Sequence, residues 1–510
     1  MTELKKTIAF VVVAVLLMGA AVWLTPSQGG SDEFFSDQGQ GFFPSFKDPL
    51  ACTSLEVIDY DSGTATAAPF KVMFKNGQWV IPSHHSYPAD AKDRLAKTAA
   101  GVIDLKKDTI RSDRTEDHED MGVIDPLDTK TTSLKGRGKR VTLRNKSDEV
   151  LADFIIGKEV PGRPDQRFVR VPDQKRTYGV NVKVDLSTRF ADWIETNLLK
   201  LDSAKVRKLT FDTHKVIPEE GRVEPGELLK VDRKEAFGPW TLEKVKLEPD
   251  QEVNADKLST LTSALGDLKI VGVRPKPAGL TQDLKAEGGG GIKLTQAALL
   301  SLESKGFYLT RDGRLLSNQG DLVVSTDEGI VYTLRFGEVV FSSGEELSAG
   351  VDDEKATKDK PKDKKGDEKK EGGAESRYLF VTVEFDPALI PPPAPPKTKE
   401  PTEAEVFEDP FQKDPNDPKV VAEQKAAKEE ADRAQEEHDR KVKEGKDRAK
   451  ELTDRFAAWY YVVPGDSFRS LMLDRTSLVR KKQENPPPGA PGAPPGGFGG
   501  LPPSFAPPPR

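Results

Sequence analysis

The adjacent histidines His84 and His85 are the first residues in this sequence whose type suggests chemistry. Imidazole is a common metal ligand and a common general base. Neighbouring residues on a strand point to opposite faces, so the two rings cannot easily share one ion. The surrounding loop contains no helix-spaced pair of histidines. We therefore expect a loop or helix-entry role for this pair and predict no metal ligands.

Three other stretches contain residues that are typical of functional sites. Residues 116–120 are acidic and include His118, but they lack the alternating spacing of a calcium loop and predict a solvated turn. Residues 287–295 contain four glycines and a lysine without the G-x-x-x-x-G-K-[ST] pattern that binds phosphate. The single Cys52 excludes an internal disulfide and a multi-cysteine zinc site. With no serine nucleophile elbow in view, we predict no catalytic residue and no cofactor.

The composition describes globular parts separated by solvated segments. The chain has 510 residues, of which 32% are charged and 36% hydrophobic, with 39 prolines and 42 glycines. Single cores rarely exceed about 250 residues, so two or three domains are expected. A net charge of -7 gives no general attraction to nucleic acid. The locally basic stretch 135–146 is explained by lysine and arginine at a hairpin edge, so no nucleic-acid partner is predicted.

The amino terminus carries the strongest single signal in the chain. Lys5 and Lys6 precede an uncharged run from Thr7 to Leu24, which is long enough to cross most of a ~30 Å hydrocarbon layer. A cleaved signal peptide is the competing interpretation, but its apolar core is usually shorter, and Trp23 suits a membrane interface. The basic residues before the run and acidic residues after it predict a single-pass anchor in the cytoplasmic membrane. The amino terminus would be cytoplasmic and the body extracytoplasmic or periplasmic.

An internal repeat organises the rest of the chain. A hairpin that ends at a tryptophan is followed by an amphipathic helix, first over residues 70–106 and again over residues 226–269. The distance from the tryptophan to the helix differs by only two residues between the copies. We predict a structural role for the residues that recur at matching positions, which are Trp79, Leu95, Val102 and Leu105 in the first copy and Trp240, Leu258, Leu265 and Leu268 in the second.

The remaining elements of the two copies agree more loosely. "TYGVNVKVD" in the first copy has its likeness in "WYYVVPGDSF" in the second. The first copy should end in a helix, because its last apolar residues have helical spacing; these are Leu186, Phe190, Trp193, Ile194, Leu198 and Leu201. The second copy gains a helix and a strand at residues 294–318 and two further insertions. These two insertions are expected to project from neighbouring parts of one domain.

The last insertion contains a long charged helix that begins at Asp417 and Pro418. Pairs of opposite charge such as Glu437 and Lys441 support it at i, i+4 spacing. A thin apolar stripe follows one face and is interrupted by Gly445. Two interpretations remain open, a solvated helix lying on its own domain and a coiled coil that binds a partner.

The predicted fold class is therefore α+β. An N-terminal transmembrane helix precedes two repeated mixed α/β modules of antiparallel hairpins and packed helices, with a long inserted charged helix and disordered segments. The predicted boundaries are a transmembrane anchor at 1–25, a flexible tether at 26–52, a first repeat module at 53–202, a second repeat module at 203–386 plus 457–480 with a disordered insertion at 349–376, an inserted Pro-rich segment and helix at 387–456, and a disordered Pro/Gly-rich tail at 481–510.

These motifs together resemble a known bacterial family. The hairpin ending in tryptophan, the helix "ADAKDRLAKTAAGVIDLK", the segment "MGVIDP" and the stretch "FIIGKEVPGRPDQRFVRV" are similar to the family catalogued as domain of unknown function 4340. The resemblance covers residues 54–200 well and residues 203–345 and 376–386 more weakly. It implies a membrane-anchored envelope protein, often encoded beside an ABC-type transporter of the gliding-motility or export kind. It implies no catalytic residues.

We therefore expect a non-catalytic accessory or scaffold protein of an envelope complex, with a protein partner and the membrane as its contacts. An alternative is a cell-wall or polysaccharide binding module, which requires Trp79 and Trp240 to be exposed. A third hypothesis is an envelope enzyme, which requires convergent polar side chains in a pocket between the modules.

Overall fold

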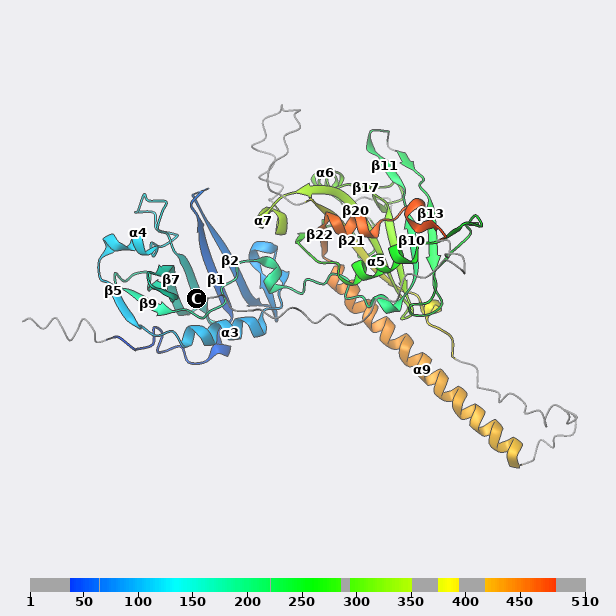
Figure 1. The fold of residues 1–510 in the computed structure, drawn as a ribbon, viewed down its shortest axis with the longest axis horizontal. Helices are drawn as coiled ribbons and strands as arrows, with labels where there is room; N and C mark the ends of the chain where they lie inside the picture. Colours follow the sequence, from blue (N-terminus) through cyan, green and yellow to red (C-terminus); the bar gives the residue numbers. More distant parts are fainter. Residues whose placement is uncertain are drawn as a thin grey trace, which may run out of the picture.

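The structure is a computed structural model, and it confirms the α+β class with antiparallel sheets and packed helices. Figure 1 shows two sheet-containing modules, the first in blue to cyan and the second in green to red, with one long helix leaving the second. The predicted anchor, the first part of the tether (26–36), most of the disordered insertion (351–374) and nearly all of the tail (483–510) lie outside the described residues. These residues are 37–63, 65–220, 222–285, 294–350, 375–393 and 418–482.

The first module is built on a nine-stranded antiparallel sheet with the order β4-β3-β2-β1-β6-β7-β8-β9-β5. Asn76 and Gly77 form the predicted tight turn between β2 and β3, both with positive φ, as such hairpins require. The strands are β1 (Ser54–Asp61), β2 (Thr66–Lys75), β3 (Gln78–Ile81), β4 (Tyr87–Pro88), β5 (Thr109–Ser112), β6 (Lys139–Arg144), β7 (Val150–Val160), β8 (Arg163–Arg170) and β9 (Thr177–Asn181).

The second module has an eight-stranded sheet with the order β14-β13-β10-β19-β20-β21-β22-β16. If β4 is left out of the first sheet, the two sheets follow the chain in the same order, strand for strand, so the repeat extends to the topology. The strands are β10 (Val206–Asp212), β13 (Leu228–Asp232), β14 (Thr241–Leu242), β16 (Gly272–Pro275), β19 (Asp321–Thr326), β20 (Ile330–Phe341), β21 (Glu375–Phe385) and β22 (Trp459–Pro464).

Equivalent helices connect equivalent strands in the two modules. They are α3 (Lys92–Ile103) and α5 (Ala255–Gly266), each of 12 residues. The apolar residues that the repeat analysis aligned on and just after these helices are all buried, namely Leu95, Val102, Leu105, Leu258, Leu265 and Leu268. Trp240 is buried as well, whereas Trp79 is partly buried against the same core. The aligned positions are thus where each helix packs on its sheet.

Smaller elements complete the described residues. The helix and strands predicted near residues 294–318 are present as α6 (Gln296–Glu303), β17 (Phe307–Leu309) and β18 (Leu315–Ser317). The others are η1 (Pro49–Ala51), η2 (Pro82–His84), η3 (Thr115–Asp117), α4 (His118–Met121), η4 (Phe190–Trp193), η5 (Ser203–Lys205), β11 (Lys215–Ile217), η6 (Pro218–Glu220), β12 (Arg222–Glu224), β15 (Gln251–Val253), α7 (Gly344–Ser348), η7 (Pro387–Leu389), α10 (Gly465–Leu471), α11 (Arg475–Leu478) and β23 (Val479–Lys481).

The helix predicted to close the first module does not form. Only one 3-10 turn, η4, is present, and the following residues are irregular, with one isolated bridge between Asn197 and Lys269. Their backbone groups bond to the second module instead, because Leu198 N donates to Leu268 O at 2.8 Å and Ile270 N donates to Thr196 O at 2.9 Å. The apolar residues of the stripe are still buried, except for the half-buried Leu186, so this linker satisfies the hydrophobic pattern and the backbone hydrogen bonds without a helix.

The expected position of the two long insertions is also wrong. Residues 342–374 join β20 to β21, and residues 386–458 join β21 to β22. In the antiparallel pairing, Phe341 faces Glu375 at one end of β21, whereas Ile330 faces Phe385 at the other end. Successive connections of an antiparallel sheet leave from opposite ends, so the two insertions leave from opposite ends of the second sheet.

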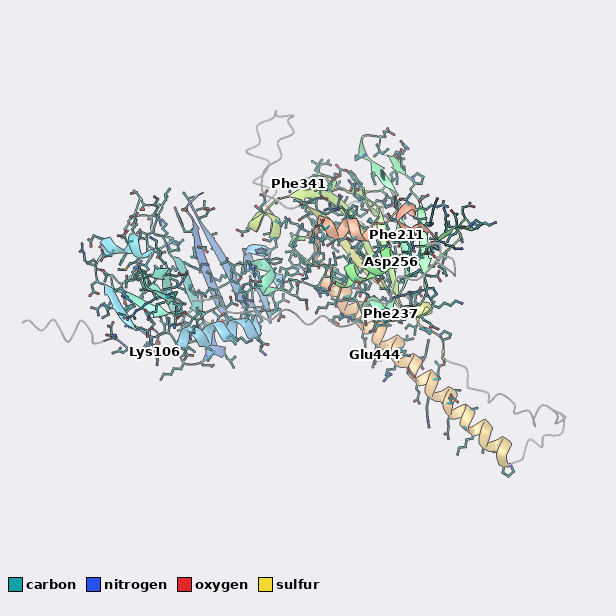
Figure 2. All side chains as sticks on the ribbon, viewed as in Figure 1. Lys106, Phe211, Phe237, Asp256, Phe341 and Glu444 are labelled. Atoms are coloured by element: carbon teal, nitrogen blue, oxygen red, sulfur yellow. The ribbon has the colours of Figure 1, made fainter. Side chains whose placement is uncertain are left out.

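The predicted long helix is present as α9 (Pro418–Phe456), and only its last turns lie on the second module. Ala449, Leu452 and Phe456 are buried there. Glu437 and Lys441 form the predicted ion pair at 2.7 Å. Figure 2 labels Glu444 where the helix leaves the module, and the described side chains before it are exposed or half-buried. The end of α9 therefore lies on its own domain, as the first interpretation predicts. For the projecting part of α9, the coiled coil that binds a partner stays a prediction.

Gly445 is the point of closest approach between α9 and the second sheet. An added Cβ would lie 2.3 Å from the Glu328 carbonyl oxygen and 2.9 Å from the ring of Phe385. Glycine is therefore required here by backbone proximity rather than by its own φ angle. Glycine lowers helix propensity, but at this position its missing side chain allows α9 to pack closely against the sheet.

We predict that Gly445→Ala destabilises the protein by about 1–3 kcal/mol, because the helix must move away from Glu328. On an exposed helix face, replacing glycine with alanine stabilises a protein by about 1 kcal/mol. The sign of the change in unfolding free energy therefore distinguishes a packed glycine from an exposed one. Denaturant unfolding measures the change, and hydrogen exchange of the Ala449 amide reports the local loosening. The exposed Glu444→Ala is the control, with a change within about 0.5 kcal/mol. A more stable Gly445→Ala protein would contradict the packing.

Candidate functional site

His84 lies at the surface where the first module meets the second. Its ring is buried and stacks on Phe190 with the centroids 4.3 Å apart and the planes 3° from parallel. Nδ1 is hydrogen-bonded to the hydroxyl of Ser83 at 2.9 Å, and Nε2 to the hydroxyl of Ser348 in the second module, also at 2.9 Å. Both ring nitrogens therefore have partners, and one of these partners is in the other module.

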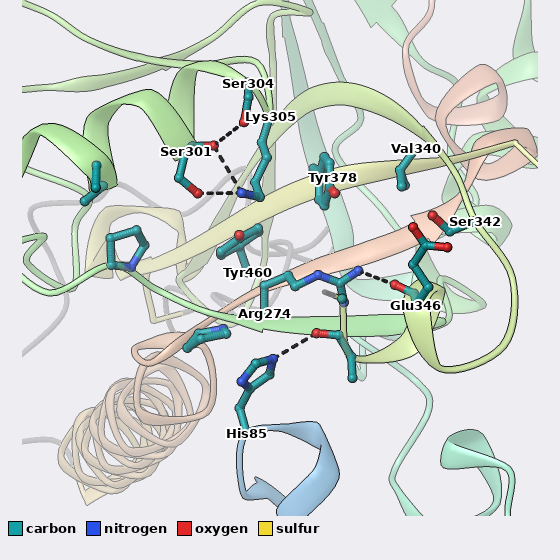
Figure 3. A pocket seen from close by; sticks show the side chains of 16 residues that line it. His85, Arg274, Ser301, Ser304, Lys305, Val340, Ser342, Glu346, Tyr378 and Tyr460 are labelled. Carbon is teal, nitrogen blue, oxygen red and sulfur yellow. Dashed lines mark hydrogen bonds between the residues drawn. The ribbon is translucent and has the colours of Figure 1, made fainter. Parts of the chain in front are cut away.

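His85 makes a second hydrogen bond to the same part of the second module. Its Nε2 donates to the backbone oxygen of Ala349 at 2.8 Å, as Figure 3 shows. His85 and Ser86 both have positive φ, which folds the chain into a tight loop and turns the two rings towards the second module. The predicted loop role of the histidine pair is therefore a joint between modules. No sequence pattern indicated this role, because the hydrogen-bond partners are 264 residues away along the chain.

Arg274 on β16 holds the partner segment in place from the other side. Its Nη2 donates to the backbone oxygens of Glu346 and Leu347, at 3.0 and 3.1 Å, near the carboxyl end of α7. A cation is favourable at this end of a helix. Gly350, with φ +86°, lies so close that an added Cβ would be 2.4 Å from Arg274 Nε. Arg274 thus positions α7, which in turn contacts the two histidines.

Apolar contacts extend the joint beyond this segment. Tyr87 of the first module packs edge-to-face on Trp459 of the second, with the ring centroids 5.0 Å apart. Arg455 of α9 donates to the Asn197 carbonyl in the linker at 2.6 Å. Buried side chains of both modules form one contiguous cluster. The modules are therefore joined by packing as well as by the histidines.

A cavity of about 630 Å³ opens beside this joint. His85 is the residue of the first module that lines it, and Figure 3 shows how the other side chains converge from β16, α6 and the sheet. The polar side chains of the second module that line it are Arg274, Ser301, Ser304, Lys305, Ser342, Glu346, Tyr378 and Tyr460. A polar pocket between the modules, which the enzyme hypothesis requires, is thus present among the described residues.

The serine and lysine of this cavity are explained by helix capping. Lys305 Nζ donates to Ser301 Oγ at 2.5 Å and to Ser301 O at 3.2 Å. These bonds satisfy groups in the last turn of α6, where a lysine is favourable. A serine nucleophile would need a deprotonated base and donors for the oxyanion, whereas this lysine donates to the serine.

A second polar cluster superficially resembles a catalytic triad. His214 lies 3.1 Å from Asp212 through Nδ1, and its Nε2 is 3.0 Å from the backbone oxygen of Ser317. The hydroxyl of Ser317 donates instead to Gly320 O at 2.7 Å and to Asp321 at 2.9 Å. Burial raises the pKa of Asp321. Because the histidine bonds to the serine carbonyl and not to its hydroxyl, the cluster orders a loop rather than activating a nucleophile.

The remaining candidate residues have structural surroundings. Burial raises the pKa of Cys52 to about 11, so its thiol is protonated and unreactive at neutral pH. His118 is buried and bonds to Lys175 O at 2.8 Å.

Over the part of the chain that the structure describes, no three histidine, cysteine or carboxylate side chains group as metal ligands. In the same part, no helix is long and apolar enough to cross a bilayer, and the predicted anchor lies outside it.

We predict that the joint weakens as the pH falls below 6.5. Burial lowers the pKa of His84 to about 4, with smaller contributions from His85 and Arg274. The unfolded chain binds a proton at about pH 6.5 and the folded chain only near pH 4, so stability is full above pH 6.5 and decreases towards pH 4. The unfolding free energy of His84→Gln should therefore fall less steeply over this range than that of the unmodified protein. His438→Gln on α9 is the control, and parallel pH profiles for His84→Gln and the unmodified protein would contradict the assignment.

Comparison with known proteins finds one family whose model matches part of each module. Residues 79–283 match the family model described as "Domain of unknown function (DUF4340)". No curated protein and no solved structure matches the chain. The matched region runs from Trp79 in the first copy of the repeat to the end of the aligned helix in the second and beyond it. The match supports, over residues 79–283, the family that the sequence motifs indicated.

Proposed function

We propose that this protein is a non-catalytic accessory or scaffold subunit of an envelope complex. It is anchored by the apolar run at residues 7–24, with both modules outside the cytoplasm. The resemblance to its family suggests an ABC-type transport or gliding-motility system as the complex. The observation that carries the proposal is α9, which stands away from the body that holds its end.

The projecting part of α9 is suited to contact a partner at a distance from the modules. From Gly445 back to Pro418 the helix has 27 further residues, which is about 40 Å at 1.5 Å per residue. Its half-buried positions include Ala427, Ala431 and Ala434, which share one face at helical spacing. The same face continues into the residues that are buried on the second module.

The polysaccharide-binding alternative has less support. Trp240 is only 9% exposed and is covered by Arg233, whose guanidinium lies 4.7 Å from the ring centroid. Trp79 is partly buried and packs edge-to-face on Phe74. Sugar binding by stacking needs a flat aromatic face open to solvent; Trp240 has none, and Trp79 is only partly open. Phe237 is 81% exposed but is a single ring.

The enzyme alternative has a pocket but no arrangement for chemistry in the described residues. In the joint cavity the hydrogen bonds of Arg274 and Lys305 position α7 and cap α6. In the second cluster His214 is bonded to backbone and to Asp212. A catalytic group must be within reach of a reacting atom, whereas these groups serve the fold.

Site-specific photo-crosslinking in intact cells tests the scaffold role. A photoreactive residue at the exposed Arg433 of α9 should form adducts with membrane transport components. A matched probe at Val150, which is 50% exposed in the first module, should form far fewer of them. Mass spectrometry of the adducts gives the partners. Recovery of no envelope protein from the Arg433 probe would count against the proposal.

Protease protection tests the topology independently of the partner. Protease added outside spheroplasts should cleave the two modules, because the positive-inside rule places them beyond the membrane. Fragments detected with antibodies against each module report the cleavage. Full protection of both modules until the membrane is lysed would place the body in the cytoplasm and overturn the topology.

A further inference from the structure

The carboxyl-terminal end of α9 is bonded to the segment that connects the two modules. We call residues 449–456 the base of α9 and residues 194–202 the linker. In the base, Arg455 Nη2 donates to the backbone oxygens of Glu195 and Asn197 in the linker, at 3.3 and 2.6 Å. Hydrogen bonds from a charged donor are stronger than bonds between neutral groups. The linker therefore holds the base of α9 together with the sheet on which it packs.

The base of α9 also reaches the first module, through β22. Two residues separate the end of α9 from Trp459, which packs edge-to-face on Tyr87 of the first module with the ring centroids 5.0 Å apart. Tyr461 on β22 is buried; its hydroxyl donates to Arg455 O at 3.3 Å, and its ring centroid lies 6.0 Å from that of Phe456. Side chains in such close packing cannot shift independently. A displacement of the base therefore moves groups that the first module contacts.

Further contacts lead from the linker to the histidine joint. The linker pairs with residues 268–270 through two backbone hydrogen bonds of 2.8 and 2.9 Å. These residues lead directly into β16, where Arg274 donates to carbonyl oxygens of α7. The same α7 carries Ser348, whose hydroxyl is the hydrogen-bond partner of His84. A continuous series of contacts thus connects the base of α9 to the joint.

Two cavities beside the base of α9 leave room for it to move. One, of about 580 Å³, lies between α9, the linker and the second sheet, and its lining includes Arg448 and Tyr332. The other, of about 470 Å³, is lined by residues of the first module, the linker, α9 and β22, among them Tyr87 and Trp459. Lys200 of the linker lines both cavities. A helix with space on two sides can adopt a second position, which a fully packed helix cannot.

We propose that α9 is a lever that couples a bound partner to the contact between the two modules. Gly445, where α9 lies closest to the sheet, is its pivot. From the pivot the helix extends about 40 Å to Pro418 and about 15 Å to Arg455, at about 1.5 Å per residue. Movement of the long arm therefore tilts the base and pulls on the linker. Because coupling free energies are reciprocal, loosening the module joint in turn loosens the base.

Hydrogen exchange of the full-length protein tests the coupling from the joint towards α9. His84→Ala removes a joint side chain whose described partners all lie outside α9. We expect the peptides that cover residues 449–458 to exchange about fivefold faster in this variant. Ser348→Ala removes the same joint hydrogen bond from the second module and should act in the same direction. The matched control, His118→Ala, removes another buried histidine of the first module and should leave these peptides unchanged.

Exchange of α7 tests the coupling in the opposite direction. Arg455→Gln removes the charged hydrogen bonds from the base of α9 to the linker. The Ala349 and Gly350 amides, which donate to carbonyl oxygens of α7 at 2.7 and 3.0 Å, should then exchange about fivefold faster. Arg433→Gln removes the same charge from the exposed, projecting part of α9 and should leave both amides unchanged.

The outcomes decide between a coupled and an uncoupled helix. Faster exchange in both directions, with unchanged controls, supports the lever. No change at the base of α9 in the two joint variants, no change at α7 in Arg455→Gln, or equal changes in a variant and its control would overturn it. The coupling belongs to the chain alone, and only the partner rests on the proposed function. Photo-crosslinking that recovers no envelope protein would therefore count against the scaffold role and leave the exchange result standing.

Discussion

The burial of a neutral imidazole between two modules is the constraint on which the rest of this structure depends. His84 is stacked on Phe190 and hydrogen-bonded through both ring nitrogens, once within its own module and once to Ser348. A buried polar group is tolerated only when its hydrogen bonds are made. The position of α7, set by Arg274, therefore fixes where the first module sits on the second.

The two modules share one strand order but differ in the connections between their strands. The first module uses it with compact connections, whereas the second carries its long insertions in the connections on either side of β21. Loops at strand ends can be lengthened at a small entropic cost, because the ladder itself is unchanged. Gly445 then allows α9 to pack closely against the second sheet, where the insertion begins and ends. The repeat supplies a stable frame, and the insertions supply what distinguishes this chain.

The polar clusters of the described residues share one feature that bears on function. In the joint cavity and around His214, the described hydrogen bonds lead to backbone carbonyls and to nearby side chains such as Ser301, Asp212 and Asp321. Such bonds orient segments of the fold. In the described residues these clusters connect segments of the fold, whereas the projecting part of α9 stands away from them.

The sequence by itself determined the features that depend on local spacing. The Asn76-Gly77 hairpin, the helices at Lys92–Ile103 and Ala255–Gly266, and α9 follow from turn residues and helical periodicity, which act between near neighbours. The apolar spacing from Leu186 to Leu201 suggested a helix, yet tertiary pairing with residues 268–270 holds that segment in an irregular conformation. Tertiary structure alone decided the opposite exits of the insertions and the partners of His84 and His85, because these depend on residues brought together from hundreds of positions apart.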